Sequence, residues 1–584
     1  MPEEKNEKLE IMRHSMSHIM AAAILKLYPK VKFAIGPAID NGFYYDIDFG
    51  KNTISDSDLV KIEEEMKNII KANLSFEKSE LPVAKAMARE KKSGQIYKEE
   101  MIKDLKKQGE KNVSYYKLGE FEDLCIGPHI KSTGQVQNGS WKLEKLAGAY
   151  WRGDEKNKML VRIYGLAFAT RQDLENYLKM MEEAEKRDHR KIGRELDLFS
   201  FHEVAPGMPF FHPKGAIIYD ELKKFWVEAQ AAFNYQYVIC PTMLDVSIWK
   251  QSGHFDHYKD DMYFLQTEKG EKQYALRPMD CPGAILIYNN SLKSYRDLPL
   301  RYAEPGLITR KEKSGQLNGL FRVQQFVQDD AHIFIAVDQI EKEVKNVIRL
   351  VNKIYEPFGM KYKAYLSTRP DDFMGDINDW EKAEKALEKI LDEVYGKGNY
   401  GLKEKDGAFY GPKIDYQLED AIGRTWQCAT IQLDFQMPLK FNCKFINSKG
   451  EDEVPVLIHR TAMGSFERFM GILIEHYAGA FPVWLSPVQV KIVSVGATHV
   501  EFCKKLADEF KQNDIRVEVD ETDETVGNKI RKAVGEKMPY MLVIGDREMA
   551  SDKLAVRDRG EKITREISKE EFIKEVRNKI KERK

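Results

Sequence analysis

The segment Arg322–Ile335, RVQQFVQDDAHIFI, constrains the fold more than any other part of the sequence. Read with the two-residue period of a β-strand, it gathers cationic, amide, carboxylate, imidazole and aromatic side chains on one face. A half-buried strand of a simple sheet has an apolar face opposite a polar one. The pattern therefore predicts a strand that forms the wall of a polar pocket, and the alternative is an edge strand with a mixed exterior. The residues of that face are Arg322, Gln324, Phe326, Gln328, Asp330, His332 and Phe334.

Length and composition narrow the class of protein. A chain of 584 residues corresponds to roughly three to five domains. Its 92 Lys and Arg residues balance 93 Asp and Glu residues, for a net charge of −1, which excludes a histone-like binder but permits a local basic patch. The apolar content of 42% excludes global disorder.

Targeting and redox signals favour the cytoplasm. The first residues, MPEEKNEKLE, contain no apolar segment, so we expect no signal peptide. No apolar run reaches about 18 residues, and we therefore expect no membrane partner. The six cysteines form no CxxC pair, which suits a reducing compartment.

Alternating helix and strand patterns divide the chain into four parts. We predict an α/β domain at 1–170, a charged linker helix at 171–196, a strand-rich block at 197–484 and a small α/β domain at 485–584. The second boundary falls within PVWLSP, which has a proline at each end.

Several long segments, in order, resemble one family. RKEKSG followed by the strand described above resembles motif 2 of class II aminoacyl-tRNA synthetases, and more narrowly of threonyl-tRNA synthetases. VICPTML with SGHFDHY resembles motif 1 and its sequel, LRPMDCPGA a cysteine-bearing motif, and HRTAMGSFERFMGILIEHY motif 3. GAFYGPKID and WQCATIQLDF match other blocks of the family. The resemblance implies an α+β multidomain protein, with an α/β editing domain, a class II antiparallel-sheet catalytic domain and a C-terminal α/β anticodon-binding domain.

The resemblance also implies an activity. Such an enzyme forms threonyl-adenylate from L-threonine and ATP with Mg²⁺, and passes threonine to tRNA(Thr). Since negative charge builds up on the phosphates, catalysis needs positioned cations. By motif match, Arg310 contacts the α-phosphate, Arg322 and Arg468 lie along the triphosphate, Phe326 stacks on adenine and Glu312 accepts from its amino group. Further matches are Lys413 as a catalytic residue, Gln427 for ATP, and Gln328, Tyr410, Thr430 and Gln432 for the substrate.

Three residues far apart in sequence are implied to bind Zn²⁺, one ion per chain. They are Cys281, His332 and His459. One cysteine and two histidines leave a coordination position open, as in catalytic zinc sites. The family binds threonine there, and Asp330 is then placed to accept its hydroxyl group. Taken singly, each of the three residues would more often be a core cysteine or histidine.

A second cluster lies near the N-terminus. His14 and His18 are four residues apart on one predicted helix face, and Cys125 and His129 repeat the spacing in CIGPH, where Pro128 indicates a loop. Spacing alone favours a zinc site formed by the four residues. The alternative without a functional site is a solvated helix face beside a cysteine in a loop. The resemblance implies a third interpretation, a site that hydrolyses mischarged seryl-tRNA(Thr) without a required metal, joined by Tyr45, Lys98 and Asp123. One methyl group discriminates threonine from serine by only about 1–3 kcal/mol, so a second, hydrolytic site is needed.

The remaining predictions concern assembly. Glu548 and Arg557 match anticodon positions, and motif 1 implies a homodimer. The chain begins almost at the editing helix, so we expect it to lack the ubiquitin-like domain that many bacterial relatives carry, and to function without it. Two rivals remain: an inactive tRNA-binding paralogue, which would be expected to lose Arg310, Arg468 or a zinc ligand, and an ATP-dependent ligase with another acceptor.

Overall fold

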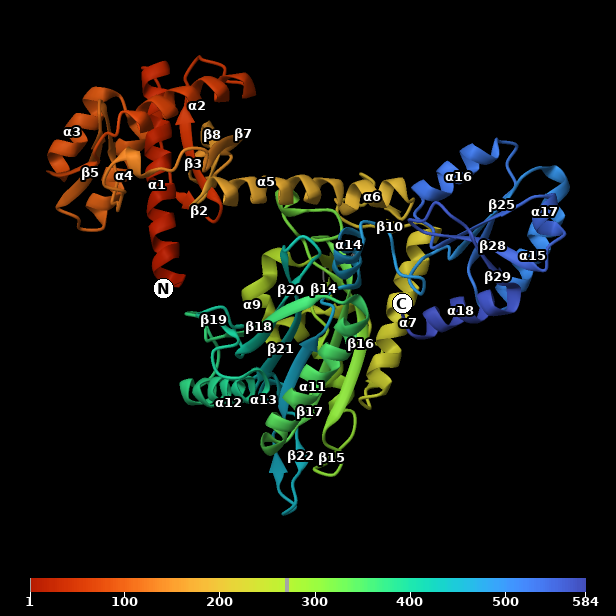
Figure 1. Ribbon diagram of the computed structural model, residues 1–584. Helices are drawn as coiled ribbons and strands as arrows, with labels where there is room; N and C mark the ends of the chain where they lie inside the picture. Colours follow the sequence, from red (N-terminus) through yellow and green to blue (C-terminus); the bar gives the residue numbers. More distant parts are fainter. Residues whose placement is uncertain (1, 268–272) are drawn as a thin grey trace. The chain divides into compact units, whose positions relative to one another are not determined.

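The computed structural model describes residues 2–267 and 273–584 and divides the chain into two compact units, Met1–Glu182 (unit 1) and Glu183–Lys584 (unit 2) (Figure 1). Both units combine helices with mixed or antiparallel sheets, which confirms the predicted α+β multidomain class. In the described ranges, no helix combines the length and the apolar composition that a bilayer span requires.

Unit 1 is built on a five-stranded sheet covered by helices α1 (Pro2–Leu27) and α2 (Asp56–Lys71). The helices cover one face because Phe43, Tyr45 and Ile47 alternate along β3 and pack against α1. A second, three-stranded sheet carries α3 and α4. The strands and remaining helices are β1 (Lys32–Phe33), β2 (Ala38–Ile39), β3 (Gly42–Asp48), β4 (Glu77–Pro82), α3 (Val83–Ser93), α4 (Ile96–Lys107), β5 (Asn112–Leu118), β6 (Phe121–Leu124), β7 (Trp141–Tyr150), β8 (Met159–Ala167) and α5 (Arg171–Lys186).

An eight-stranded sheet forms the centre of unit 2, in the order β11-β16-β17-β24-β21-β20-β18-β19. Its central strands are antiparallel, and the two outermost pairs, β11 with β16 and β18 with β19, are parallel. The strands of this sheet are β11 (Gln236–Tyr237), β16 (Leu300–Thr309), β17 (Gln325–Ile335), β18 (Lys361–Ser367), β19 (Gly401–Lys403), β20 (Lys413–Glu419), β21 (Thr425–Asp434) and β24 (Val456–Thr461).

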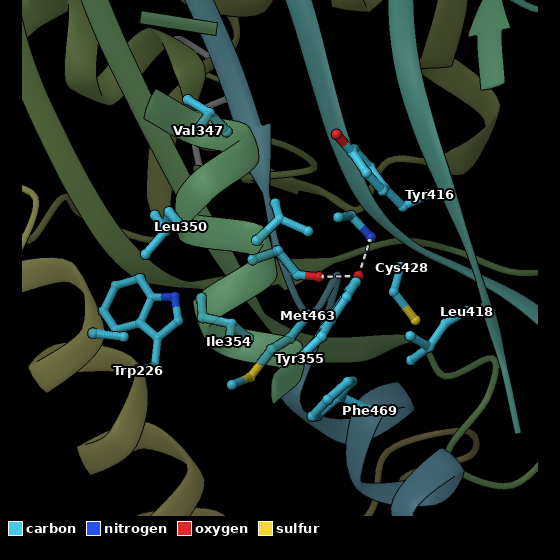
Figure 2. Packing of buried hydrophobic residues seen from close by; sticks show 14 of the residues in the cluster. Trp226, Val347, Leu350, Ile354, Tyr355, Tyr416, Leu418, Cys428, Met463 and Phe469 are labelled. Atoms are coloured by element: carbon cyan, nitrogen blue, oxygen red, sulfur yellow. Dashed lines mark hydrogen bonds between the residues drawn. The ribbon is translucent and has the colours of Figure 1, made fainter. Parts of the chain in front are cut away.

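Helix α11 (Ile340–Tyr355) shows how the sheet is covered. Val344, Val347, Val351 and Ile354 recur at helical spacing and are buried in the main core of unit 2. Figure 2 shows part of this packing between α11, Trp226 of α7 (Pro213–Ala231) and sheet residues such as Leu418. The Tyr355 hydroxyl donates to the carbonyl of Ala462 (2.7 Å) and accepts from the amide of Ala429 (3.0 Å). A buried phenol thus joins β21 to the turn before α14 (Phe466–His476).

The smaller elements surround this sheet. They are α6 (His189–Glu195), β9 (Phe199–Ser200), β10 (Phe210–Phe211), β12 (Met243–Asp245), α8 (Val246–Ser252), α9 (His254–Tyr258), β13 (Phe264–Gln266), β14 (Gln273–Leu276), α10 (Cys281–Asn289), β15 (Lys293–Ser294), α12 (Ile377–Tyr395), α13 (Met437–Lys440), β22 (Phe445–Ile446) and β23 (Asp452–Glu453).

The C-terminal part of unit 2 carries a separate five-stranded sheet in the order β26-β25-β27-β28-β29. Its first three strands are parallel, as expected for strands connected through helices. Its elements are β25 (Val490–Ser494), α15 (Val500–Gln512), β26 (Val517–Asp520), α16 (Val526–Gly535), β27 (Tyr540–Ile544), α17 (Asp546–Met549), β28 (Lys553–Asp558), β29 (Arg565–Ser568) and α18 (Lys569–Lys581).

The strand predicted from Arg322 onward begins later than expected. Strand β17 starts at Gln325, so Arg322 and Gln324 lie in the preceding loop. The chain turns there because Asn318 and Arg322 pair with each other, and the Gln324 amide donates to the carbonyl of Gly207 (2.7 Å). From Phe326 onward the two faces separate as predicted, because Val327, Ala331, Ile333 and Ile335 pack in the main core.

Candidate functional site

A buried thiol and two buried imidazoles converge at the centre of the large sheet. His332 of β17 and His459 of β24 are directly paired across the two strands, and Cys281 opens helix α10. One ligand atom from each of the three lies within 4.8 Å of the other two. Strand pairing thus brings together two residues separated by 127 positions (459 − 332), and helix α10 supplies the third.

The donor set fits a zinc ion. The buried Nε2 atom of His332 has no hydrogen-bond partner within the described ranges, and the nearest carboxylate oxygen, from Asp330, is 3.9 Å away. His459 Nε2 lies 2.9 Å from Asp434 Oδ2, a pairing that orients metal-binding imidazoles elsewhere. Burial lowers the pKa of His332 and raises that of the Cys281 thiol. A thiol and two neutral imidazoles suit zinc, and a cation there would satisfy the orphaned nitrogen.

Three of the predicted substrate residues, Asp330, Tyr410 and Gln432, lie beside this triplet. The Tyr410 hydroxyl donates to Gln432 Oε1 (2.5 Å), and Gln432 is paired with His459 across β21 and β24. The Lys413 ammonium binds the buried carboxylate of Asp415 (2.9 Å). Burial, and then the charge of Asp280, raise the pKa of Asp330 well above its ordinary value. The site therefore holds both hydrogen-bond acceptors and donors.

Every residue predicted to bind ATP lines one cavity of about 410 Å³. The Arg322 guanidinium pairs with Glu312 (Nε to Oε2, 2.9 Å), and Arg310 lies 5.4 Å from the centre of the Phe326 ring. The Nε atom of Arg468 is buried and without a hydrogen-bond partner in the described part of the chain. Three guanidinium groups and two aromatic rings, those of Phe321 and Phe326, suit a nucleoside triphosphate. The predicted residues in its lining are Arg310, Glu312, Arg322, Phe326, Gln328, Gln427, Thr430 and Arg468.

A β-bulge explains how Gln427 reaches the same cavity as Thr430. Counted along a regular strand, the two side chains would point to opposite faces. The register between β20 and β21 shifts, so that Asp415 faces Thr430 but Gln417 faces Gln427. Both side chains then donate to Asp415 Oδ1, Gln427 at 2.7 Å and Thr430 at 2.9 Å.

The N-terminal quartet is also assembled. One ligand atom from each of His14, His18, Cys125 and His129 lies within 4.8 Å of the others. The Cys125 sulfur lies 3.3 Å from both His14 Nε2 and His129 Nε2. Burial lowers the pKa of all three imidazoles, that of His129 to about 2, and raises the pKa of Cys125 to about 11. As predicted, residues 125–130 form a loop.

A buried ion pair stands beside the quartet. The Lys98 ammonium lies 2.5 Å from Asp123 Oδ1 and 3.1 Å from the hydroxyl of Tyr45, which donates to Asp123. His14, His18, Lys98, Asp123 and Cys125 line a cavity of about 760 Å³. The seven residues predicted for editing therefore form one connected group, with Tyr45 and His129 behind the lining.

The two predicted anticodon residues lie on separate elements. Glu548 belongs to α17, past the carboxyl end of β27, and its carboxylate accepts from the amide of Gly545 (3.0 Å). Arg557 on β28 pairs with Met541 at the other end of β27, and its Nε donates to the carbonyl of Glu561 (2.7 Å).

Comparison with known proteins accounts for most of the chain. Residues 263–477 match the tRNA synthetase class II core domain (G, H, P, S and T), residues 489–579 an anticodon binding domain, and residues 113–164 the threonyl and alanyl tRNA synthetase second additional domain. The threonine–tRNA ligase of Clostridium botulinum (strain Kyoto / Type A2) is 53% identical over 570 residues, which are 98% of this chain and 88% of that protein. The chain belongs to the threonyl-tRNA synthetase family.

Other members of the threonyl-tRNA synthetase family are similar to this chain over most of its length. The threonine–tRNA ligase of Clostridium kluyveri is 51% identical over 99% of this chain and 89% of its own length. A crystal structure titled as the RNA binding domain of threonyl-tRNA synthetase from Cryptosporidium parvum has 38% sequence identity and a TM-score of 0.64. It covers 67% of this chain and 98% of the solved chain.

Three buried residues of the site were not predicted. His254 is fully buried, with Nε2 3.8 Å from the Cys281 sulfur and a pKa that burial lowers to about 3. Asp434 and Asp415 bind His459 and Lys413. Asp434 follows Gln432, and Asp415 follows Lys413, by two residues, so the strand period could have found both. No comparable signal marks His254.

Proposed function

We propose that the protein attaches L-threonine to tRNA(Thr) through threonyl-adenylate and removes serine from mischarged seryl-tRNA(Thr). The observation that carries the proposal is one sheet that holds His332 and His459, completed to a triplet by Cys281 of α10, beside an arginine-lined cavity. The first suits a small amino acid bound at a metal, and the second suits ATP with Mg²⁺. The adjacency of the two is what adenylate formation requires.

Within this proposal each side chain has a role that its position permits. Arg310, Arg322 and Arg468 balance the charge that develops on the phosphates. Phe326 stacks on adenine, Glu312 and Gln427 bind the nucleotide, and Lys413 is held by Asp415 for the reacting groups. Gln328, Tyr410, Thr430 and Gln432 bind the substrate, and Asp330 accepts the threonine hydroxyl.

Cys281, His332 and His459 would hold one Zn²⁺ per chain. When bound, the ion would supply an open coordination position for the amino and hydroxyl groups of threonine. In unit 1, His14, His18, Tyr45, Lys98, Asp123, Cys125 and His129 would bind and hydrolyse the seryl ester.

We extend the proposal to organisation and assembly. It divides the chain into an editing domain at 1–170, a linker helix at 171–196, a catalytic domain at 197–484 and an anticodon-binding domain at 485–584, which uses Glu548 and Arg557. The segment that resembles motif 1 exposes Ile239 by 77%, and Tyr237 just before it is exposed by 51%, as expected for the contact surface of a homodimer. The cytoplasm is the proposed location, since six unpaired cysteines suit its reducing conditions.

Threonine-dependent ATP–pyrophosphate exchange, followed by charging of purified tRNA(Thr), tests the proposal. The proposed ligase performs both reactions. An inactive tRNA-binding paralogue performs neither, and a ligase with another acceptor activates threonine without charging tRNA. Deleting 485–584 is expected to spoil charging and spare exchange, whereas equal loss of both would assign that domain a structural role. Light scattering at micromolar concentration is expected to show a dimer, and a monomer would contradict the assembly.

A further inference from the structure

A histidine outside the predicted sites supports the loop before β17. His189 of α6 is 1% exposed and lies between Glu475 of α14 and Leu320. Its Nδ1 atom is 2.7 Å from Glu475 Oε1, and its Nε2 atom is 2.9 Å from the backbone nitrogen of Leu320. The His189 backbone amide donates to the same Glu475 oxygen (3.0 Å).

These partners determine how the imidazole is protonated. A backbone N–H can only donate, so His189 Nε2 accepts from Leu320. The ring proton must therefore be on Nδ1, from which it is donated to the Glu475 carboxylate. Both nitrogen atoms of the neutral ring are thus engaged, one in each direction.

The same contacts argue against a metal site. Asp188, His189 and Glu475 bring ligand atoms within 4.8 Å of one another, as a metal site would. However, the guanidinium of Arg190 already pairs with Asp188, and that of Arg424 with Glu475. With both imidazole nitrogens engaged and both carboxylates paired with arginines, the cluster offers a cation no free ligand. The cluster is therefore a hydrogen-bond network in which these groups already have partners.

The loop is shaped to lie on this imidazole. Gly319 adopts φ +49°, and a Cβ atom there would come within 2.1 Å of His189 Nε2. The Phe321 ring has its centre 4.1 Å from the His189 ring and 4.2 Å from the ring of Trp426. Trp426 is held in turn, since its Nε1 donates to Asp420 (3.0 Å), which also binds Arg424.

The supported segment ends in the nucleotide cavity. Phe321 and Arg322 follow Leu320 directly, and both line the cavity of about 410 Å³. We infer that His189 is a positioning residue for ATP, which holds Leu320 through its neutral Nε2 atom so that Phe321 and Arg322 face the nucleotide. The inference rests on the proposed function, because it assigns ATP to that cavity.

Two substitutions separate the two hydrogen bonds of His189. His189→Asn keeps a donor near the Nδ1 position, toward Glu475, but offers no acceptor to Leu320. His189→Gln reaches the Nε2 position with an oxygen and keeps that acceptor. The Asn variant leaves the buried N–H of Leu320 without an acceptor, which destabilises the loop that faces ATP. We therefore expect KM for ATP to rise about tenfold in this variant and KM for threonine to stay unchanged. The Gln variant should remain within about threefold of the parent.

Hydrogen exchange of peptides that contain Leu320 measures the hydrogen bond between Leu320 and His189 independently of enzyme activity. Exchange at 318–323 should accelerate in His189→Asn and stay near the parent in His189→Gln. Gly319→Ala reaches the same contact from the loop side and should raise KM for ATP as the Asn variant does. The matched control is His499→Gln. The buried His499 accepts the Gly496 amide at Nδ1 (3.1 Å) and pairs with a carboxylate through Nε2, so the Gln variant removes a backbone acceptor in the C-terminal sheet region. This variant should leave both KM for ATP and hydrogen exchange at 318–323 unchanged.

The outcomes are distinguishable. Equal effects of the Asn and Gln substitutions on KM for ATP, or parent-like hydrogen exchange at 318–323 in His189→Asn, would overturn the inference. Threonine-dependent pyrophosphate exchange at saturating ATP, which uses unit 2, reports whether each variant is folded; if both His189 variants lose it, Gly319→Ala decides alone. A parent protein without threonine-dependent exchange would instead refute the proposed function, while the hydrogen-exchange comparison would still test the contact.

Discussion

The two clusters of histidine and cysteine use similar side chains in different surroundings. In unit 2, Cys281, His332 and His459 are all buried, and His332 Nε2 has no partner in the described ranges. In unit 1, His14, Cys125 and His129 are half-buried and contact one another and their neighbours, while His18 is buried and its Nδ1 atom also has no hydrogen-bond partner in the described ranges. His14 Nδ1 is 3.3 Å from the carbonyl of Pro128, and His129 Nδ1 is 3.1 Å from the hydroxyl of Ser15.

The charges around each cluster differ as well. Carboxylates approach the triplet in unit 2, Asp434 at 2.9 Å from His459 and Asp330 at 3.9 Å from His332. In unit 1 the carboxylate of Asp123 is already paired with the Lys98 ammonium. The comparison teaches that ligand type alone does not define a metal site. A fully buried donor set approached by carboxylates favours a cation, whereas a half-buried set whose neighbouring carboxylate is already paired with a lysine can work without one.

The largest expected effect separates the clusters by metal dependence. Cys281→Ala or His332→Ala should abolish threonine-dependent pyrophosphate exchange and remove the bound zinc, about one ion per chain in the parent. Zinc content and exchange rate are the two measurements. Cys443→Ala is the matched control, since Cys443 is buried in the same small core as Cys281 but outside the triplet. Full exchange activity in metal-free protein would refute this account.

The next effect tests what the unit 2 site recognises. In the proposed pocket, zinc and Asp330 would both bind the hydroxyl group of threonine, and valine would leave both without a partner in a desolvated site. Sites of this kind reject the analogue without the hydroxyl by roughly 10⁴–10⁵. We expect negligible valine activation, measurable serine activation, and loss of the threonine preference in Asp330→Ala, each measured by pyrophosphate exchange. Valine-dependent exchange equal to that with serine would contradict the proposed pocket.

The third effect is the converse of the first. His14→Ala or Cys125→Ala should leave threonine charging intact and let seryl-tRNA accumulate, because only the unit 1 site is changed. Cys281→Ala provides the reciprocal control and should deacylate seryl-tRNA at the parent rate. Chelation of zinc should likewise impair activation more than deacylation. Parent-like deacylation by both unit 1 variants would disprove the editing assignment.

The smallest expected effect is a difference between the two units in how their stability depends on pH. The buried imidazoles of unit 1 have lowered pKa values, that of His129 about 2, so the unfolded chain binds protons near pH 6.5 that the folded unit does not. Unit 1 should therefore lose stability as the pH falls from 7.5 to 5. Unit 2 also has buried imidazoles with lowered pKa values, His254 and His332, but in addition burial raises the pKa of Glu467 there to about 7. The folded chain keeps a proton there that the unfolded chain releases near pH 4.5. That contribution, at most roughly 3 kcal/mol, is present at pH 4.5 and is lost as the pH rises through 7.

Hydrogen exchange of peptides from each unit in the full chain, corrected for intrinsic rates, measures both trends. Glu467→Gln cannot ionise, so it should remove the alkaline loss in unit 2 and leave the acid loss in unit 1. A Glu467→Gln variant whose unit 2 keeps the pH profile of the parent would contradict this account.

Local periodicity predicted the parts of the fold that depend on a single strand or helix. The polar face of β17 from Phe326 to Phe334 could be seen in the sequence, because alternate residues of a strand share a face. The same reasoning failed at Arg322 and Gln324, where a turn and a hydrogen bond to Gly207 replace the strand. It also counted Gln427 on the opposite face from Thr430, since a bulge depends on the partner strand.

The sequence by itself determined the kinds of chemistry available: the cationic residues of the ATP cavity, the spaced histidines of α1, the polar face of one strand and, through its ordered motifs, the family. Tertiary structure alone decided which of these groups meet. The registers of β17, β24 and β21 bring His332, His459 and Gln432 side by side, and helix packing brings His189 to Leu320. The physical reason is that a residue's face follows from its neighbours in the chain, whereas a contact across more than a hundred residues depends on register and packing, which no local pattern encodes.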